Sequence, residues 1–182
     1  LGPAAPGQPF GPGPAAALDE LVALATEWGL TAQNLEGYVG AVDLNDRETE
    51  LHILGHLDVV DPGEGWTVTS AFEPKLVDGL LYGTDDDKGP VLAALMAMRA
   101  VKDLGFSLKK NVRLIAGTDE ETGFRDIHWY YDRHPYAPHT ISPDADFPII
   151  NIEKGHYQPT FRAAWPQEAA LPRVSSFTGG PR

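Results

Sequence analysis

The sequence predicts an α/β domain of three layers, α/β/α, built around a largely parallel sheet. Segments with the character of strands and helices alternate along the chain, and this order is typical of such domains. The strand candidates are Glu50–Val60, Asn111–Gly117 and Pro148–Glu153, and the helix candidates between them are Pro90–Leu104 and Ile127–Arg133. With 42% hydrophobic residues among 182, the chain can bury one core of ordinary size.

The helix expected at 90–104 has the clearest pattern. Pro90 suits the first turn of a helix, and Gly105 follows its end. Its apolar residues recur at helical spacing and form one stripe, made of Val91, Leu92, Leu95, Met96, Val101 and Leu104. An earlier helix is expected where Leu18, Leu21, Val22, Ala25 and Trp28 share one face.

Three stretches divide the chain. Residues 1–14 are rich in Gly, Pro and Ala and are expected to form an irregular arm. Residues 15–174 are expected to form the domain itself. Residues 175–182 read as the beginning of a further segment, so we expect this domain to be incomplete at its C-terminal end.

The composition excludes several classes of partner. A formal net charge of −12 disfavours nucleic acid and anionic membrane surfaces, because both attract a basic face. No apolar run approaches the ~20 residues that cross a bilayer, and no signal-peptide pattern begins the chain, so we expect a cytoplasmic location. The chain has no cysteine, so any metal must be held by His, Asp and Glu.

Four polar clusters lie at or near the ends of the expected elements. They are Gly55–Asp58, Asp85–Gly89, Asp119–Gly123 and Ser142–Asp146. In open α/β sheets, ligands bind outside the carboxyl ends of the strands, so these clusters are expected to meet at one edge. Each cluster alone has an ordinary interpretation, such as a surface pair, a helix cap or an acidic turn.

One histidine among several carboxylates indicates a cation site. Zinc accepts both donor types, and a pair of zinc ions needs a bridging carboxylate. His56 and Asp58 suit a ligand and the carboxylate that orients its ring, whereas Glu120 and Glu121 offer one metal ligand and one proton acceptor. The other histidines have no ligand spacing and are expected to be structural or to lie on the surface; they are His52, His128, His134, His139 and His156.

In order along the chain, the motifs resemble those of one family, the co-catalytic zinc exopeptidases that include bacterial Xaa-dipeptidases, carnosinases and acyl-amino-acid deacylases. The motifs are Pro9-Phe10-Gly11, GHLDVV at 55–60, GEGW at 63–66, DDKGP at 86–90, GTDEETG at 117–123 and PDADFPIINIEKG at 143–155. The last stretch is most similar to the bacterial dipeptidase branch. The fold implied is the α/β/α catalytic domain of a zinc peptidase, truncated before its lid domain.

The resemblance implies a role for each site residue. His56, Asp86 and Asp144 would hold one Zn2+, and Asp86 would bridge to a second Zn2+ held by Glu121. Glu120 would be the general base for attack of metal-bound water, and Asp58 would orient His56. The segment before Asp86 is two residues shorter than usual in the family, so Asp85 remains an alternative bridge. The implied reaction is hydrolysis of a dipeptide that has a free amino end.

Two further functions remain open. One is an N-acyl-amino-acid deacylase or desuccinylase on the same scaffold, and the other is a non-catalytic, truncated metal-binding domain. In the family a lid segment and a last zinc-binding histidine lie beyond the matched region. This chain alone is therefore expected to bind the second ion weakly and to have little activity. The expected partners are a small peptide substrate and the missing C-terminal segment, with a homodimer as an alternative for the complete protein.

Overall fold

The computed structural model describes residues 2–145, 148–152, 154–155, 157 and 159–160. The chain divides into two compact units, residues 1–149 and 150–182. Within the described part of the chain, all helices and strands lie in the first unit. They are α1 (Pro12–Glu27), β1 (Thr31–Leu35), β2 (Val39–Asp43), β3 (Thr49–His56), β4 (Lys75–Val77), β5 (Leu80–Tyr82), α2 (Lys88–Asp103), β6 (Asn111–Gly117), a 3₁₀ turn (Glu120–Thr122), α3 (Arg125–Tyr131) and β7 (His139–Ile141).

The main sheet has five strands in the order β1-β2-β6-β3-β7. Strands β6, β3 and β7 are parallel, whereas β1 pairs with β2 and β2 pairs with β6 in the antiparallel sense. The α/β class is confirmed, and the sheet is mixed because an antiparallel pair precedes its parallel part. That pair escaped prediction because β1 (TAQNL) is largely polar and has no apolar alternation.

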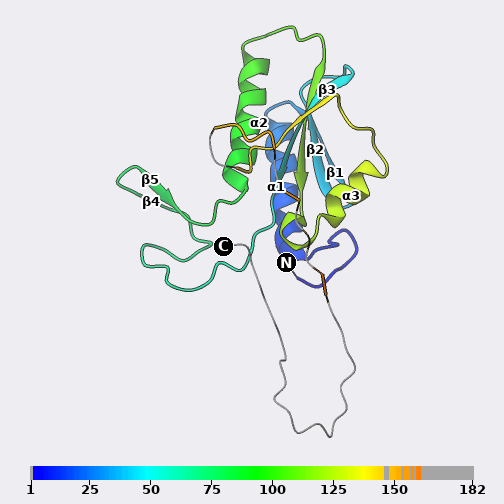
Figure 1. Ribbon diagram of the computed structural model, residues 1–182. Helices are drawn as coiled ribbons and strands as arrows, with labels where there is room; N and C mark the ends of the chain where they lie inside the picture. Colours follow the sequence, from blue (N-terminus) through cyan, green and yellow to red (C-terminus); the bar gives the residue numbers. More distant parts are fainter. Residues whose placement is uncertain (1, 146–147, 153, 156, 158, 161–182) are drawn as a thin grey trace, which may run out of the picture. The chain divides into compact units, whose positions relative to one another are not determined.

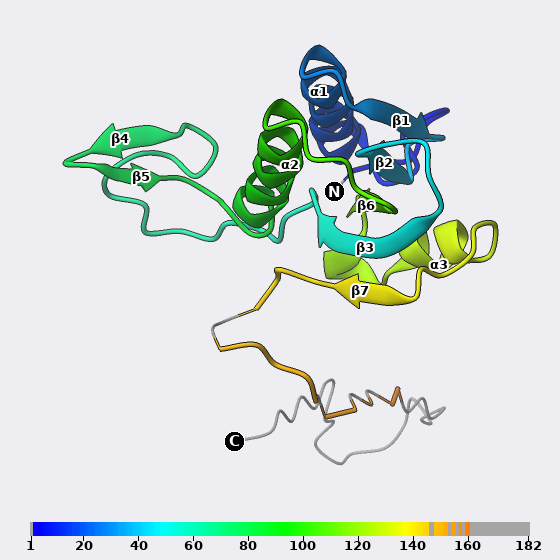
Figure 2. The same cartoon turned by 90° about the horizontal axis from the view of Figure 1, so that it is seen from above.

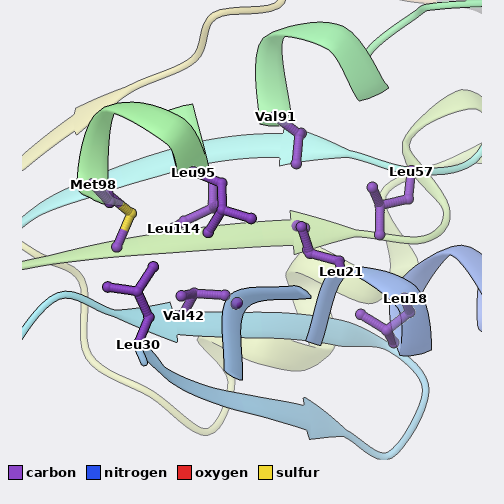
Figure 3. Close-up of a cluster of buried hydrophobic side chains, with 11 residues drawn as sticks. Leu18, Leu21, Leu30, Val42, Leu57, Val91, Leu95, Met98 and Leu114 are labelled. Carbon is purple, nitrogen blue, oxygen red and sulfur yellow. The ribbon is translucent and has the colours of Figure 1, made fainter. Parts of the chain in front are cut away.

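Helices cover both faces of this sheet, as the three-layer prediction required. Helices α1 and α2 lie on one face and α3 on the other (Figures 1 and 2). On the first face, Leu18 and Leu21 of α1 and Leu95 of α2 pack on Val42 and Leu114 of the sheet (Figure 3). On the opposite face, a smaller cluster is made of Val39, Ile115 and Tyr130. Burial on both faces fixes the position of β6 at the centre of the sheet, whereas the residues of β7 are exposed.

Several expected boundaries differ from the structure. Helix α1 begins at Pro12, so the last residues of the expected arm are helical. Strand β3 ends at His56, four residues before the expected end at Val60. Helix α3 covers Arg125–Tyr131, two residues earlier than expected. Between residues 12 and 131, each expected helix and strand nevertheless forms near its expected position, and β6 has the expected bounds.

The third parallel strand was predicted in the wrong place. It is β7, His139–Ile141, whereas residues 148–152 form no strand, and Glu153 lies outside the described residues. Side chains in that apolar stretch are exposed, with Ile149 at 89% and Ile152 at 84%. Strand β7 is only three residues long and all three are exposed, so its sequence has no alternation of apolar and polar residues. Residues 161–174 of the expected domain and the expected further segment, 175–182, also lie outside the described residues.

A long connection joins β3 to α2. It contains the separate two-stranded sheet of β4 and β5, which projects away from the main sheet (Figures 1 and 2). Leu76, Leu80 and Leu81 of this hairpin are exposed. Among the helices of the described residues, none has the length and apolar character needed to cross a membrane.

Candidate metal centre

The register of two parallel strands brings the site together. His56, the last residue of β3, pairs with Gly117, the last residue of β6, so both strands end at the same level. Glu120 and Glu121 begin the 3₁₀ turn, which is separated from the end of β6 by two residues, and Asp144 follows β7, which runs parallel to β3. The polar residues after these strands therefore share one sheet edge, as the sequence predicted.

The imidazole Nε2 of His56 is at the centre of the group. It lies 3.5 Å from Asp86 Oδ1, 3.6 Å from Asp144 Oδ2 and 4.0 Å from Glu120 Oε2. Two sets of three residues place their donor atoms within 4.8 Å of one another: His56, Asp86 and Asp144, and His56, Glu120 and Glu121. His56 is thus common to both sets, and it is the only histidine in either set.

Asp58 fixes the orientation of this imidazole. His56 Nδ1 lies 2.9 Å from the backbone carbonyl oxygen of Asp58 and 3.5 Å from its carboxylate Oδ1. In the neutral ring, which metal coordination requires, both acceptors favour the tautomer that carries the proton on Nδ1 and leaves the lone pair of Nε2 toward the carboxylates. The His56 and Asp58 side chains are 3% and 0% exposed, so neither ring nor carboxylate can turn freely.

The turn that holds the two glutamates depends on Asp119, which the sequence placed in the same cluster, and on Asp126, which the sequence did not single out. Asp126 is fully buried, and its Oδ2 accepts the backbone N–H groups of Thr118 and Asp119. Asp119 pairs through both carboxylate oxygens with the guanidinium of Arg125 at 2.6 Å. A side chain at Gly117 would collide with the Asp126 carboxylate, so glycine is needed there. The available signal was an aspartate near the start of a helix, a common capping position.

The start of α2 places Asp86 in the group. Asp87, which is buried, packs on β3, and its Oδ2 accepts the backbone N–H of His56 at 3.3 Å. Asp86 precedes it and has a side chain that is 69% exposed, facing His56. The Asp85 carboxylate lies instead against Gly89, within the first turn of α2. In this geometry Asp86, and not Asp85, is the residue beside the imidazole.

Burial and charge shift the proton affinities in this site. Burial acts to lower the pKa of His56, but the hydrogen bonds and charge of Asp58, together with the charge of Glu120, raise it to about 9. Burial, followed by the charge of Asp144, raises the pKa of Asp87 to about 6. Burial also raises the pKa of Glu120, against the opposing charge of His56. Burial, together with a surplus of carboxylates around one ring, accounts for this pattern.

The donor set fits a divalent metal ion. One imidazole nitrogen and several carboxylate oxygens converge, and the opposite ring nitrogen has a hydrogen-bond acceptor. Among the described residues, His56 is the only basic side chain within ion-pair distance of Asp86, Asp144 and Glu120. Asp87 Oδ1 and Lys88 Nζ are buried near this group without hydrogen-bond partners among the described residues. Fold and geometry together place a candidate centre for a divalent metal ion where the parallel strands end.

The comparisons with known proteins give the family. Residues 52–164 match the family model described as peptidase family M20/M25/M40, and the chain belongs to this family. The chain is 43% identical over 154 residues to a Bacillus subtilis protein named provisionally as the dipeptidase YtjP, covering 84% of this chain and 33% of that protein. It is 39% identical over 150 residues to the Beta-Ala-Xaa dipeptidase of Lactobacillus delbrueckii subsp. lactis, covering 81% of this chain and 32% of that enzyme.

Solved structures agree with this assignment. Human carnosine dipeptidase 1 has a TM-score of 0.57 and 27% identity, and the match covers 71% of this chain and 32% of that chain. The family metallo-carboxypeptidase Sso-CP2 of Sulfolobus solfataricus, at 22% identity and a TM-score of 0.60, shows the fold alone. The chain spans about a third of the length of the relatives that it matches.

Proposed function

We propose that the complete protein containing this chain hydrolyses dipeptides with a free amino end, using zinc held at the edge of the sheet. The observation that carries the proposal is the oriented imidazole of His56, whose Nε2 faces Asp86, Asp144 and Glu120. Family membership and the relative named Beta-Ala-Xaa dipeptidase support a peptide substrate, and dipeptides in particular.

His56, Asp86 and Asp144 would hold the first ion, and Asp86 with Glu121 would hold a second. Bound zinc lowers the pKa of water at the site and polarises the peptide carbonyl. Glu120, whose side chain is 26% exposed, would take the proton from the attacking water and deliver it to the leaving amine. A raised pKa suits this exchange, because the carboxylate must hold the proton before releasing it.

The two ions should differ in affinity in this chain. Both candidate sets of ligands use His56, and one Nε2 atom coordinates one ion. The ion that takes His56 keeps three protein ligands, the number common at catalytic zinc. The second ion is then left with carboxylates alone among the described residues, which supports one tight and one weak zinc site.

The test is hydrolysis by the zinc-loaded complete protein of dipeptides and of N-acyl-amino acids, in parallel. Dipeptide turnover that disappears with a chelator and returns with zinc is the expected result. Turnover of the acylated amino acids alone would instead favour a deacylase. Zinc content per molecule, measured for the complete protein and for the 182-residue chain, tests the metal sites separately. If the complete protein binds zinc but hydrolyses neither class, a non-catalytic role follows.

The expectations for partners and location remain proposals of the same kind. A small peptide is the proposed ligand, and the acidic composition favours neither nucleic acid nor anionic membranes. Contact with a C-terminal segment, homodimer formation and a cytoplasmic location are proposals that rest on the sequence and its resemblance.

A further inference from the structure

A recess lies beside the candidate metal centre. Its volume is about 60 Å³, and its walls include the metal-site residues His56, Glu120 and Asp144. Most of the remaining wall is apolar, contributed by Leu54 and Gly55 of β3, Gly117 of β6 and, from the α3 segment, Phe124 and Ile127, and its polar members are Asp126 and Ser142. A molecule bound at the metal centre therefore has an apolar recess within its immediate reach.

Two of the apolar residues that line the recess pack against the core. Leu54 and Ile127 pack against the buried cluster of Val39, Ile115 and Tyr130 on the α3 face of the sheet. These two side chains are therefore held by the core, whereas Phe124 is 42% exposed and forms the outer wall. An apolar group that entered the recess would cover Phe124 and lose water from its own surface, which is favourable.

The backbone of Phe124 has an unusual conformation. Its φ is 58°, in the left-handed region, which a bulky aromatic residue seldom adopts. Among the described residues, the two other non-glycine residues with positive φ are Glu36 and Asp78, and both lie in hairpin turns where this conformation is common. Phe124 lies in no hairpin; its N–H donates to the carbonyl oxygen of Asp119 at 2.9 Å, within the turn that holds Glu120. The same turn thus positions a carboxylate at the metal and an aromatic wall beside it.

We infer that this recess binds the side chain of a substrate residue at the scissile amide, and that Phe124 sets the size of side chain accepted. The inference rests on the proposed peptidase function. A water-sized group needs about 10–15 Å³ in this measure of volume, so the recess has room for about four to six such groups. That capacity suits the branched aliphatic side chains of valine and leucine. An indole ring is too large, and a methyl group fills the space poorly.

The test uses amino-acid hydroxamates, which chelate zinc and carry the side chain into the adjacent space. The dissociation constants of the alanine, leucine and tryptophan hydroxamates are measured calorimetrically on the zinc-loaded complete protein. We expect the leucine compound to bind tightest. Phe124→Gly removes the ring but tolerates the positive φ, so the preference for leucine over tryptophan should fall by about tenfold, the scale of discrimination in an apolar pocket. Phe124→Ala should act in the same direction.

A matched control is Phe106→Ala. Phe106 is also exposed, at 62%, but precedes β6 and so belongs to the opposite edge of the sheet. This variant should leave the order of the three ligands unchanged. The inference is overturned if the wild-type protein has no preference among the three compounds, or if Phe124→Gly weakens all three equally. Binding is measured without turnover, so this test is independent of the proposed reaction. If the protein cleaves no dipeptide but still prefers the leucine compound, the recess remains a side-chain site and only the proposed reaction is wrong.

Discussion

The carboxylate of Asp58 accepts a hydrogen bond from the backbone N–H of Glu120 over 3.0 Å. Its second oxygen accepts the N–H of Glu121 at 3.1 Å, and its first oxygen lies 3.5 Å from His56 Nδ1. One buried side chain therefore ties the end of β3 to the turn after β6. The sequence indicated only the contact between Asp58 and His56, through the His-Xaa-Asp spacing. Asp58 positions both the imidazole and the two glutamates.

Asp58→Asn should disturb the orientation of both the His56 ring and the glutamate turn. An amide has one acceptor oxygen, so its NH₂ group would face a backbone N–H of the glutamate turn. Removing such a supporting group typically lowers metal affinity or activity by about 10–100-fold. Zinc affinity and dipeptide turnover of the complete protein measure the effect. Asp103→Asn, in an exposed pair with Arg99 at the far end of α2, is the control and should change neither quantity.

Substitutions of the adjacent residues Glu120 and Glu121 should have different effects on turnover and on zinc binding. Glu120→Gln keeps the shape of the side chain but removes the proton acceptor, so turnover should fall by about 10²–10⁴-fold while zinc content stays near normal. Glu121→Gln should instead reduce zinc binding, chiefly of the weaker ion. Metal analysis and steady-state kinetics on the same preparations distinguish the two variants. Normal turnover by Glu120→Gln at full zinc occupancy would remove Glu120 from the role of base.

Metal binding should release a proton from His56. The pKa of this ring is raised to about 9, so in the metal-free protein it carries a proton at neutral pH. Coordination requires the neutral ring, so affinity should rise with pH, by about tenfold per unit below that pKa. Calorimetry near neutral pH in two buffers of different ionisation enthalpy should find close to one proton released. Heat that is independent of the buffer would contradict the protonated ring.

Buried His52, whose pKa is shifted in the direction opposite to that of His56, should make the stability of the fold fall as pH falls. Burial, followed by the charge of Arg113, lowers its pKa, although Asp43 partly opposes this. The fold therefore favours the neutral ring, which lies 3.0 Å from the hydroxyl of Tyr131. Its contribution is fully present above the ordinary pKa of about 6.5 and is lost as pH falls through the lowered folded value. Urea unfolding between about pH 8 and pH 5 measures this loss.

His52→Gln keeps a polar partner for Tyr131 but cannot titrate, so its free energy of unfolding should vary less with pH than that of the wild type. The control is His128→Gln, at an exposed position on α3. This control should retain the wild-type pH dependence. An identical slope in wild type and His52→Gln would show that other groups cause the dependence.

Close packing at Gly55 gives a test of the fold around the site. A Cβ there would lie 2.5 Å from Val91 Cγ2 and 2.6 Å from Asp87 Oδ2, so α2 could not approach β3 as it does. Gly55→Ala should destabilise the protein by about 1–3 kcal/mol and weaken zinc binding, because Asp86 would move with α2. A Cβ at Gly13, in α1, meets no atom within 4 Å, and Gly13→Ala should be neutral or stabilising by up to about 1 kcal/mol. Chemical denaturation compares the two.

How far the sequence predicts this structure depends on the kind of signal that each element carries. Strand β6 was predicted with the observed bounds because NVRLIAG is rich in apolar residues and is bordered by Lys109-Lys110 and Thr118-Asp119. Strands β1 and β7 were missed because their residues are partly or fully exposed, and their pairing depends on neighbours distant in sequence.

The candidate site also contains residues with a recognisable sequence signal and residues without one. Its proposed ligands could be named from their motifs, because the chemistry of a metal restricts the residue types. Asp126 and Phe124 could not be named, since an isolated aspartate or phenylalanine has many ordinary uses. Their importance lies in a buried hydrogen bond and in a backbone angle, which only three-dimensional structure reveals.

The pairing of His56 with Gly117 also determines where this chain could change in length during evolution. Inserting one residue within β3 would turn the imidazole to the opposite face of the sheet, and inserting two would shift it by about 6.6 Å along the strand. Either change would separate it from Glu120. Insertions at the tip of the hairpin between β4 and β5 would disturb no residue of the site, because that hairpin forms its own sheet. Length variation among related sequences should therefore be frequent around Asp78–Gly79 and nearly absent within β3 and β6.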